Sequence, residues 1–107
     1  MRRGDLVTIA FQGDYGKPCP ALVIQGDAFL EHTSVTVLPL TSYLVDAPLL
    51  RPTIKSSEDN HLSKESQVMI DKIMTVKTEK VGPVFGHISA AELLDITRRL
   101  SVFLGIG

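Results

Sequence analysis

The chain has 107 residues, 44% of them hydrophobic and 21% charged, which fits one globular domain over residues 1–107 and leaves no room for a second core. Eleven lysines and arginines against twelve aspartates and glutamates give a formal charge of −1, so any binding of nucleic acid must rely on a local patch. A single cysteine excludes an internal disulfide, and no run approaches the roughly 18 to 20 apolar residues of a membrane span, so we expect a cytoplasmic protein that does not enter the membrane.

Two strands are predicted near the N-terminus. Residues 6–11 are rich in β-branched and apolar side chains and stop at the turn-forming cluster of residues 13–16. Residues 21–24 form the second apolar run, and the segment 17–20 before it holds two prolines. Because proline fixes its own backbone and extends the residue before it, we expect a strand with a stiff, extended entrance.

The middle of the chain predicts further short strands. Residues 34–40 form the third strand, and Pro39 within it favours an edge position or a bulge because proline cannot donate to a sheet. Residues 49–54 could form a short strand between two loops. Residues 67–73 alternate in polarity, and residues 74–76 are expected to extend that strand.

A helix is predicted at the C-terminal end of the chain. Ser89 and Glu92 form a capping box, in which each side chain bonds the backbone N–H of the other residue. The apolar residues that follow recur at three- and four-residue spacing, at positions 93, 96, 100 and 103. About five short strands followed by one amphipathic helix indicate a small barrel or strongly curled sheet with the helix packed on it.

The sequence contains no pattern for a metal or a cofactor. His32, His61 and His87 lie far apart without ligand-like spacing, and Cys19 has no second cysteine to join it. Neither a GxxxxGK[ST] nor a GxGxxG motif is present. We therefore expect no metal, no cofactor and no nucleotide-dependent chemistry.

Four stretches occur in a specific order and spacing. They are Arg3-Gly4-Asp5-Leu6, Pro20-Ala21-Leu22-Val23-Ile24-Gln25-Gly26-Asp27, Val37-Leu38-Pro39-Leu40-Thr41-Ser42, and the stretch 62–76. This arrangement resembles the MazF/PemK family of toxins from type II toxin–antitoxin systems over nearly the full length.

The resemblance implies a mainly β fold, a small SH3-like half-open barrel of the CcdB/MazF-like type with a C-terminal α-helix, assembled as a homodimer. It also implies a cognate antitoxin as partner and metal-independent cleavage of single-stranded RNA, including mRNA. In that reaction the ribose 2′-OH attacks the neighbouring phosphorus and leaves 2′,3′-cyclic phosphate and 5′-OH ends. Such a site needs a base, an acid, and fixed positive charge or donors for the phosphoryl oxygens.

Four residues match, or replace, the positions that supply this chemistry in the family. Thr41 matches the threonine that ends the third strand, and Ser42 lies beside it. The family's arginine before the second-strand proline is Cys19 here. A thiol cannot hold a phosphate as a guanidinium does, but Lys17 lies two residues earlier and should face the same side of an extended chain. The predicted catalytic residues are Thr41, Lys17, Cys19 and Ser42.

The resemblance also indicates residues for binding RNA. The family's arginine and following acid near the end of the 62–76 stretch are Met74 and Lys77 here. Lys72 and Lys77 could preserve positive charge by another route. The predicted RNA-binding residues are Arg3, Asp71, Lys72 and Lys77, with the cations expected to converge on Thr41 and Ser42.

Other interpretations of the same residues remain open. Strand-end hydroxyls such as Thr41 commonly bond the local backbone, and Arg3 with Asp5 could be a surface ion pair. The C-terminal segment 103–107 loosely resembles the tail of the gyrase-poisoning toxin CcdB, so gyrase is an alternative target. A catalytically inactive toxin-like module that only binds a partner is a third possibility.

Overall fold

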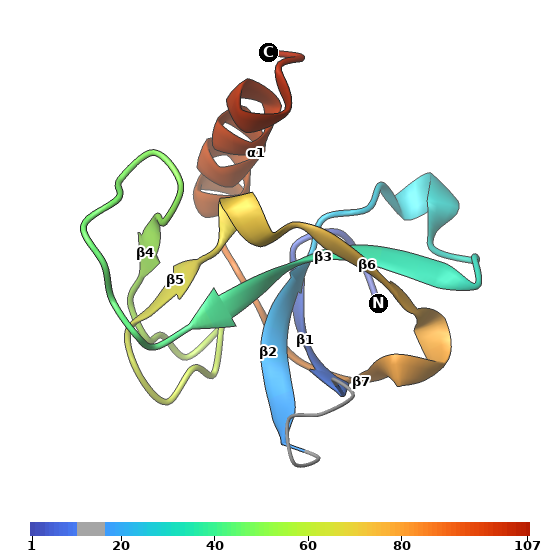
Figure 1. The fold of residues 1–107 in the computed structure, drawn as a ribbon. Coiled ribbons are helices and arrows are strands. Elements are labelled where there is room, and N and C mark those ends of the chain that lie inside the picture. Colours follow the sequence, from blue (N-terminus) through green and yellow to red (C-terminus); the bar gives the residue numbers. More distant parts are fainter. Residues whose placement is uncertain (11–16) are drawn as a thin grey trace.

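The computed structural model describes residues 1–10 and 17–107, which form short strands and one long helix (Figure 1). The strands are β1 (Asp5–Ala10), β2 (Pro18–Val23), β3 (Ser34–Thr41), β4 (Thr53–Ile54), β5 (Ser66–Val68), β6 (Met74–Lys77) and β7 (Val81–His87). The helix is α1 (Ala90–Leu104), and single 3₁₀ turns occur at η1 (Asp27–Phe29), η2 (Ile70–Lys72) and η3 (Thr78–Lys80). The predicted turn at residues 13–16, together with Phe11, lies outside the described residues.

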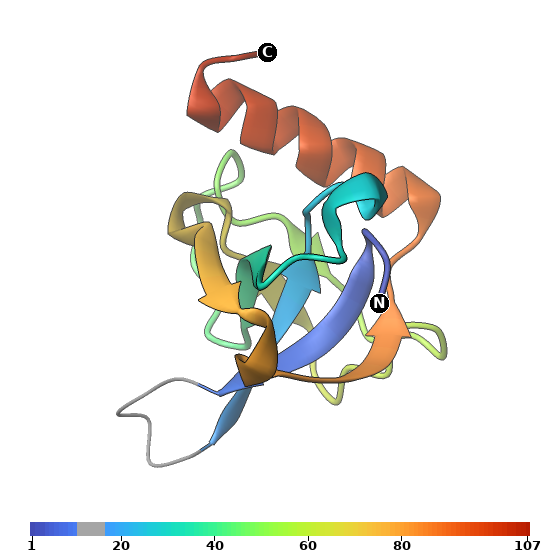
Figure 2. The same ribbon diagram turned by 90° about the vertical axis from the view of Figure 1, so that its right-hand side faces the viewer.

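The strands form one antiparallel sheet that curls into a half-open barrel. The strand order is β4-β5-β3-β2-β1-β7, and β6 pairs separately with β3. The first half of β3 pairs with β6 and its last two residues pair with β5, so β3 serves two neighbours on the same side. Figures 1 and 2 show the resulting curl, with α1 lying across one end of the sheet. The mainly β half-open barrel with a C-terminal helix, predicted from the sequence, is confirmed.

The central strands are buried on both faces, and the two faces carry side chains of different size. The face beneath α1 is built largely of leucine and isoleucine, and the opposite face inside the curl is built largely of valine. The first cluster contains Leu6, Leu22, Ile24, Leu38, Leu40, Ile54, Val68, Ile70, Ile88, Ile96 and Leu100. The second contains Val7, Ile9, Ala21, Val23, Val35 and Val37. Successive residues of a strand alternate between the clusters because side chains alternate across a sheet.

The C-terminal helix begins where the sequence predicts. The Ser89 hydroxyl accepts a hydrogen bond from the Glu92 N–H at 3.1 Å, and the Glu92 carboxylate accepts one from the Ser89 N–H at 2.9 Å. Ile96 and Leu100 of the predicted apolar stripe are buried against the sheet. The helix ends at Gly105, whose φ of 75° is the left-handed conformation that glycine adopts without strain.

Of the two positions expected for Pro39, an edge strand or a bulge, the edge strand is wrong. Strand β3 has β2 on one side and β5 and β6 on the other, and its register with β2 is continuous. Pro39 lies between Val37, which pairs with β6, and Leu40, which pairs with β5. Its carbonyl accepts the Met69 N–H at 2.8 Å. The nitrogen and carbonyl of one residue face the same side of an antiparallel strand, so the nitrogen of Pro39 also faces the point where the partner of β3 changes from β6 to β5. The proline is tolerated because no strand pairs with β3 at this point on that side, so the N–H that proline lacks is not needed.

Two further strand predictions need correction. Residues 67–76 do not form one strand, because η2 separates β5 from β6 and turns the chain between its two pairings with β3. The strand predicted at residues 49–54 is reduced to Thr53 and Ile54 of β4.

Strand β7 was not predicted, because Gly82, Pro83 and Gly86 interrupt any alternating pattern. Gly86 is required by packing. A Cβ at this position would lie 2.5 Å from the backbone oxygen of Asn60, in the loop before β5. The close approach of two backbones therefore explains Gly86, which in the sequence only interrupts the alternating pattern of a strand.

Candidate active site

A hollow of about 470 Å³ lies where the start of β2, the end of β3 and the segment before β5 meet. Its lining residues are Lys17, Pro18, Cys19, Pro20, Leu40, Thr41, Ser42, Leu62, Ser63, Lys64 and Ser66. All four predicted catalytic residues are among them. The antiparallel pairing of β2 with β3 accounts for this, since it sets the entrance of one strand beside the exit of the other.

The prolines of the β2 entrance are part of the sheet. Pro18 and Pro20 stand opposite Ala10 and Thr8 of β1, so the segment is extended as the sequence predicts. Cys19 is partly buried, and its Sγ lies 4.0 Å from the carbonyl oxygen of Lys17. The Lys17 side chain is exposed, and a flexible ammonium is thus available at the edge of the hollow.

Thr41 offers a hydrogen-bond donor to the hollow. Its Oγ1 accepts the backbone N–H of Tyr43 at 3.1 Å. A hydroxyl carries one hydrogen and two lone pairs, so after this bond the O–H hydrogen can still donate outward. The catalytic interpretation of Thr41 and the interpretation as a hydroxyl bonded to the local backbone are therefore compatible. The bond to the backbone orients a hydroxyl that lines the hollow.

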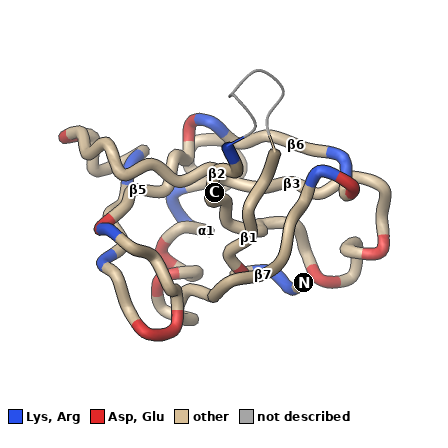
Figure 3. Tube along the Cα trace, turned by 90° about the horizontal axis from the view of Figure 1, so that it is seen from below, with Lys and Arg blue, Asp and Glu red and all other residues tan. Residues whose placement is uncertain are grey.

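A second cation, Lys64, also lines the hollow and was missed by sequence reasoning. It lies in the polar segment before β5, where no pattern distinguishes it from a solvated loop lysine. Charges of both signs are spread around the trace as a whole (Figure 3). Among the described residues that line the hollow, in contrast, two are lysines and none is a carboxylate. The hollow therefore provides two ammonium groups and several hydroxyls, which suits a phosphate-bearing ligand.

Arg3 does not reach this hollow. Its guanidinium donates to the Ile24 carbonyl at 3.1 Å and to the Thr97 hydroxyl at 2.6 Å, which ties the end of β2 to α1. The Asp5 carboxylate accepts the backbone N–H of Arg2 at 2.8 Å. The expected convergence of Arg3 on Thr41 is wrong, because these bonds direct its side chain toward the helix.

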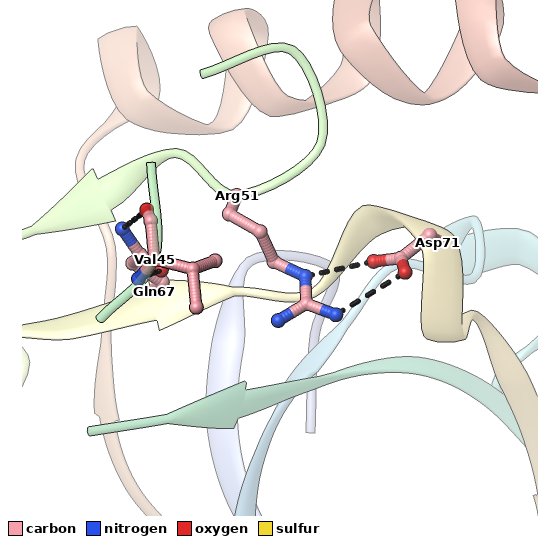
Figure 4. A network of polar contacts seen from close by, with 4 residues as sticks. All are labelled: Val45, Arg51, Gln67 and Asp71. Atoms are coloured by element: carbon pink, nitrogen blue, oxygen red, sulfur yellow. Dashed lines mark hydrogen bonds and ion pairs between the residues drawn. The ribbon is translucent and has the colours of Figure 1, made fainter. Parts of the chain in front are cut away.

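Asp71 is engaged by an arginine of the chain itself. Both its oxygens accept from Arg51, with distances of 2.9 Å from Nε and 3.2 Å from the terminal nitrogen (Figure 4). These hydrogen bonds lower the pKa of the Asp71 carboxyl and raise the pKa of Arg51. The pair joins the segment before β4 to η2.

Lys72 and Lys77 also lie outside the hollow. Lys72 is exposed on η2, and Lys77 ends β6, opposite Ser34, in a separate shallow pocket that includes Glu79. Of the four cations expected around Thr41, only Lys17 lies there, because the others are fixed by elements at different places on the barrel.

Within residues 1–10 and 17–107, no group of three or more His, Cys, Asp and Glu side chains is arranged to hold a metal ion. None of the helices in that part of the chain combines the length and apolar character needed to cross a membrane.

The curled antiparallel sheet and the terminal helix across it form a half-open barrel. The lysines and hydroxyls of the hollow at its edge suit an anionic ligand. Residues 2–104 match the family of PemK-like, MazF-like toxins of type II toxin–antitoxin systems. The chain is also 45% identical over 107 residues to the probable endoribonuclease MazF of Mycolicibacterium smegmatis, covering 99% of this chain and 98% of that protein. The chain belongs to the PemK/MazF toxin family, which confirms the resemblance of its four sequence stretches.

Solved structures share the fold. A MazE–MazF crystal structure from Deinococcus radiodurans (Form-III) superposes with a TM-score of 0.81 at 20% identity, covering 100% of this chain and 98% of that one. An endoribonuclease in complex with its cognate antitoxin, from a mycobacterial species, gives a TM-score of 0.80 at 21% identity, with coverage of 100% and 97%.

Proposed function

We propose that this chain is the toxin of a type II toxin–antitoxin pair and acts as a metal-independent endoribonuclease on single-stranded RNA, including mRNA. The observation that carries the proposal is the presence of Thr41 and Lys17 in one open hollow. Membership of the PemK/MazF toxin family and the similarity to a probable endoribonuclease support it. We place the activity in the cytoplasm, where mRNA is found.

The chemistry follows from the groups that line the hollow. The ribose 2′-oxygen attacks the adjacent phosphorus and loses its proton to water, while the bond from phosphorus to the 5′-oxygen breaks. Negative charge develops on the non-bridging oxygens, where the Thr41 hydroxyl donates and the ammonium groups of Lys17 and Lys64 stabilise it. The proposed acid that protonates the departing 5′-oxygen is the thiol of Cys19, which lines the hollow. The products carry 2′,3′-cyclic phosphate and 5′-OH ends.

Lys17 and Lys64 together take over the task of the family's arginine, whose position is Cys19. A neutral thiol cannot neutralise a phosphate, whereas an ammonium acts as a point charge and needs no fixed planar geometry. Single substitutions of the two lysines should therefore each weaken cleavage less than the double substitution.

The test is incubation of the purified protein with a long RNA in EDTA. We expect discrete fragments with 5′-OH ends, and Thr41→Ala combined with Lys17→Ala should lower the cleavage rate by about 100-fold or more. Thr75→Ala with Lys80→Ala, exposed residues outside the hollow, is the matched control. Intact RNA at high protein concentration would refute the nuclease. Growth inhibition that depends on residues 104–107 would then favour gyrase poisoning, and its absence would favour a binding module.

We also infer a homodimer built on the exposed apolar side of α1. A groove of about 680 Å³ beside this helix is lined by apolar residues from α1 and from the segment before β4, together with Asp95, Arg98 and Arg99 of α1. Leu49 and Val102 in it are 76% and 68% exposed. Apolar side chains gathered on a rigid surface mark an interaction site, and a second copy of the chain would bury them.

The proposed antitoxin is a short acidic segment that covers the hollow of Lys17 and Lys64. Its carboxylates would pair with the ammonium groups that otherwise hold phosphate, so antitoxin and RNA would compete. Loss of binding of a peptide antitoxin when both lysines are replaced by alanine, measured directly and not through cleavage, would support this arrangement.

A further inference from the structure

Gln67 is a buried polar residue in the middle of β5, next to the proposed active site. It is 5% exposed and stands between Thr41 of β3 and Thr53 of β4 in the sheet register. Burying an amide costs free energy unless its polar atoms are hydrogen-bonded. The partners of this side chain therefore show what the burial achieves.

The Gln67 amide bonds both backbone groups of a single residue outside the sheet. Its Oε1 accepts the Val45 N–H at 3.0 Å, and its Nε2 donates to the Val45 carbonyl at 2.9 Å (Figure 4). Nε2 also donates to the Thr53 hydroxyl at 3.2 Å. The Gln67 side chain thus makes the two hydrogen bonds to Val45 that a neighbouring strand would make, and it fixes the backbone at that residue.

The segment fixed in this way is the one that leaves Thr41. Residues 42–44 are exposed, with Tyr43 at 77% and Leu44 at 47%, and Val45 is 36% exposed, so apolar packing contributes little to the placement of residues 42–44. The segment is held at one end by the pairing of Thr41 with β5 and at the other by the Gln67 amide. Hydrogen bonds rather than burial therefore determine its path.

The path of this segment orients the Thr41 hydroxyl. The Tyr43 N–H that donates to Thr41 Oγ1 lies between the two anchored ends, and Ser42 lines the same hollow. We propose that Gln67 is a positioning residue, which holds segment 42–45 so that the Thr41 and Ser42 hydroxyls point into the hollow. This inference rests on the proposed function for its catalytic consequence.

The experiment compares Gln67→Met with Gln25→Met in cleavage of a short oligoribonucleotide. Gln25 is a matched control, because its amide also accepts one backbone hydrogen bond, from Thr36, and donates two, to Phe29 and Ser34, in a loop outside the hollow. Both variants remove one accepted and two donated hydrogen bonds and should lose thermal stability. Gln67→Met should lower kcat by about tenfold with KM within about threefold, because it displaces donors that act on transition-state charge and leaves the lysines in place. Gln25→Met should change kcat by less than about twofold.

Amide hydrogen exchange of the unaltered protein provides a measurement that needs no variant. The Val45 N–H should exchange at least about tenfold more slowly than an unstructured amide, because opening requires its bond to Gln67 to break. Exchange at the unstructured rate would overturn the proposal, as would equal losses of kcat in the two variants or a Gln67→Met effect confined to KM. Absence of cleavage by the unaltered enzyme would instead refute the proposed function, while slow exchange at Val45 would still support the anchored segment.

Discussion

Asp71 shows how a neighbour within the fold decides what a charged side chain does. The family pattern associates this aspartate with RNA binding, yet both its oxygens are occupied by Arg51. The two side chains are only 24% and 17% exposed, so the pair is partly shielded from water. Its main effect is to connect η2 to the segment before β4, which is a contribution to stability.

Replacing Asp71 by Asn should lower the free energy of unfolding at pH 7 by about 1 kcal/mol, because a charge-assisted bidentate pair is lost. The pairing lowers the pKa of Asp71 in the folded state, so its stabilising effect is present above the ordinary carboxyl pKa of about 4. That effect is lost as the pH falls through the lowered pKa of the folded state. Urea unfolding of both proteins from pH 7 downward measures the difference, with Asp59→Asn, an exposed residue, as control. A difference that grew on acidification would contradict the assignment.

The sequence predicted part of the hollow and not the rest, for identifiable reasons. Thr41 was predicted from the resemblance of its stretch to the family, and Lys17 from its spacing to the position of the family's arginine, Cys19. Lys64 and Gln67 could not be predicted, since their importance depends on which loop folds against which strand end. The position of the Arg3 side chain was predicted wrongly because it depends on its hydrogen bond to Thr97 of α1, and the sequence near Arg3 does not indicate where that helix packs.

Among the elements, α1 was predictable because its start is encoded by two side chains three residues apart. Strand β7 was not, because Gly86 meets a distant loop and the reason for it lies 26 positions away at Asn60. The break between β5 and β6 was also missed. Polarity alternates over residues 67–73, but the turn at η2 is imposed by pairing with two different parts of β3.

Ser89→Ala should lower the free energy of unfolding by about 1 kcal/mol, because it removes the hydroxyl that accepts the Glu92 N–H. Thermal or urea unfolding measures this loss, and Ser56→Ala, at an exposed loop position, should change stability by less than about 0.5 kcal/mol. Equal effects of the two substitutions would show that the cap contributes nothing specific.

At the level of the assembled protein, the exposed side of α1 is the surface that the proposed homodimer depends on. Val102→Asp places a charge among the apolar residues of the groove and should convert the dimer to a monomer, because burial of a carboxylate on association costs free energy. Sedimentation equilibrium measures the mass of each form. Phe29→Asp, at a residue that is 68% exposed and does not line the groove, should leave the mass unchanged. A wild-type protein that sediments as a monomer at all concentrations would refute the dimer.

The difference in side-chain size between the two faces of the central strands bears on how the chain chooses its pairing. Residues 21–24 are apolar on both faces, so a slip of β2 by one position would change little of the apolar area that these residues expose to water. It would, however, exchange Leu22 with Ala21 or Val23, crowding one compartment and leaving the other underfilled. Crowding alone typically costs about 1 to 3 kcal/mol. Side-chain volume, and not polarity, therefore favours the observed register of β2 over the register shifted by one residue.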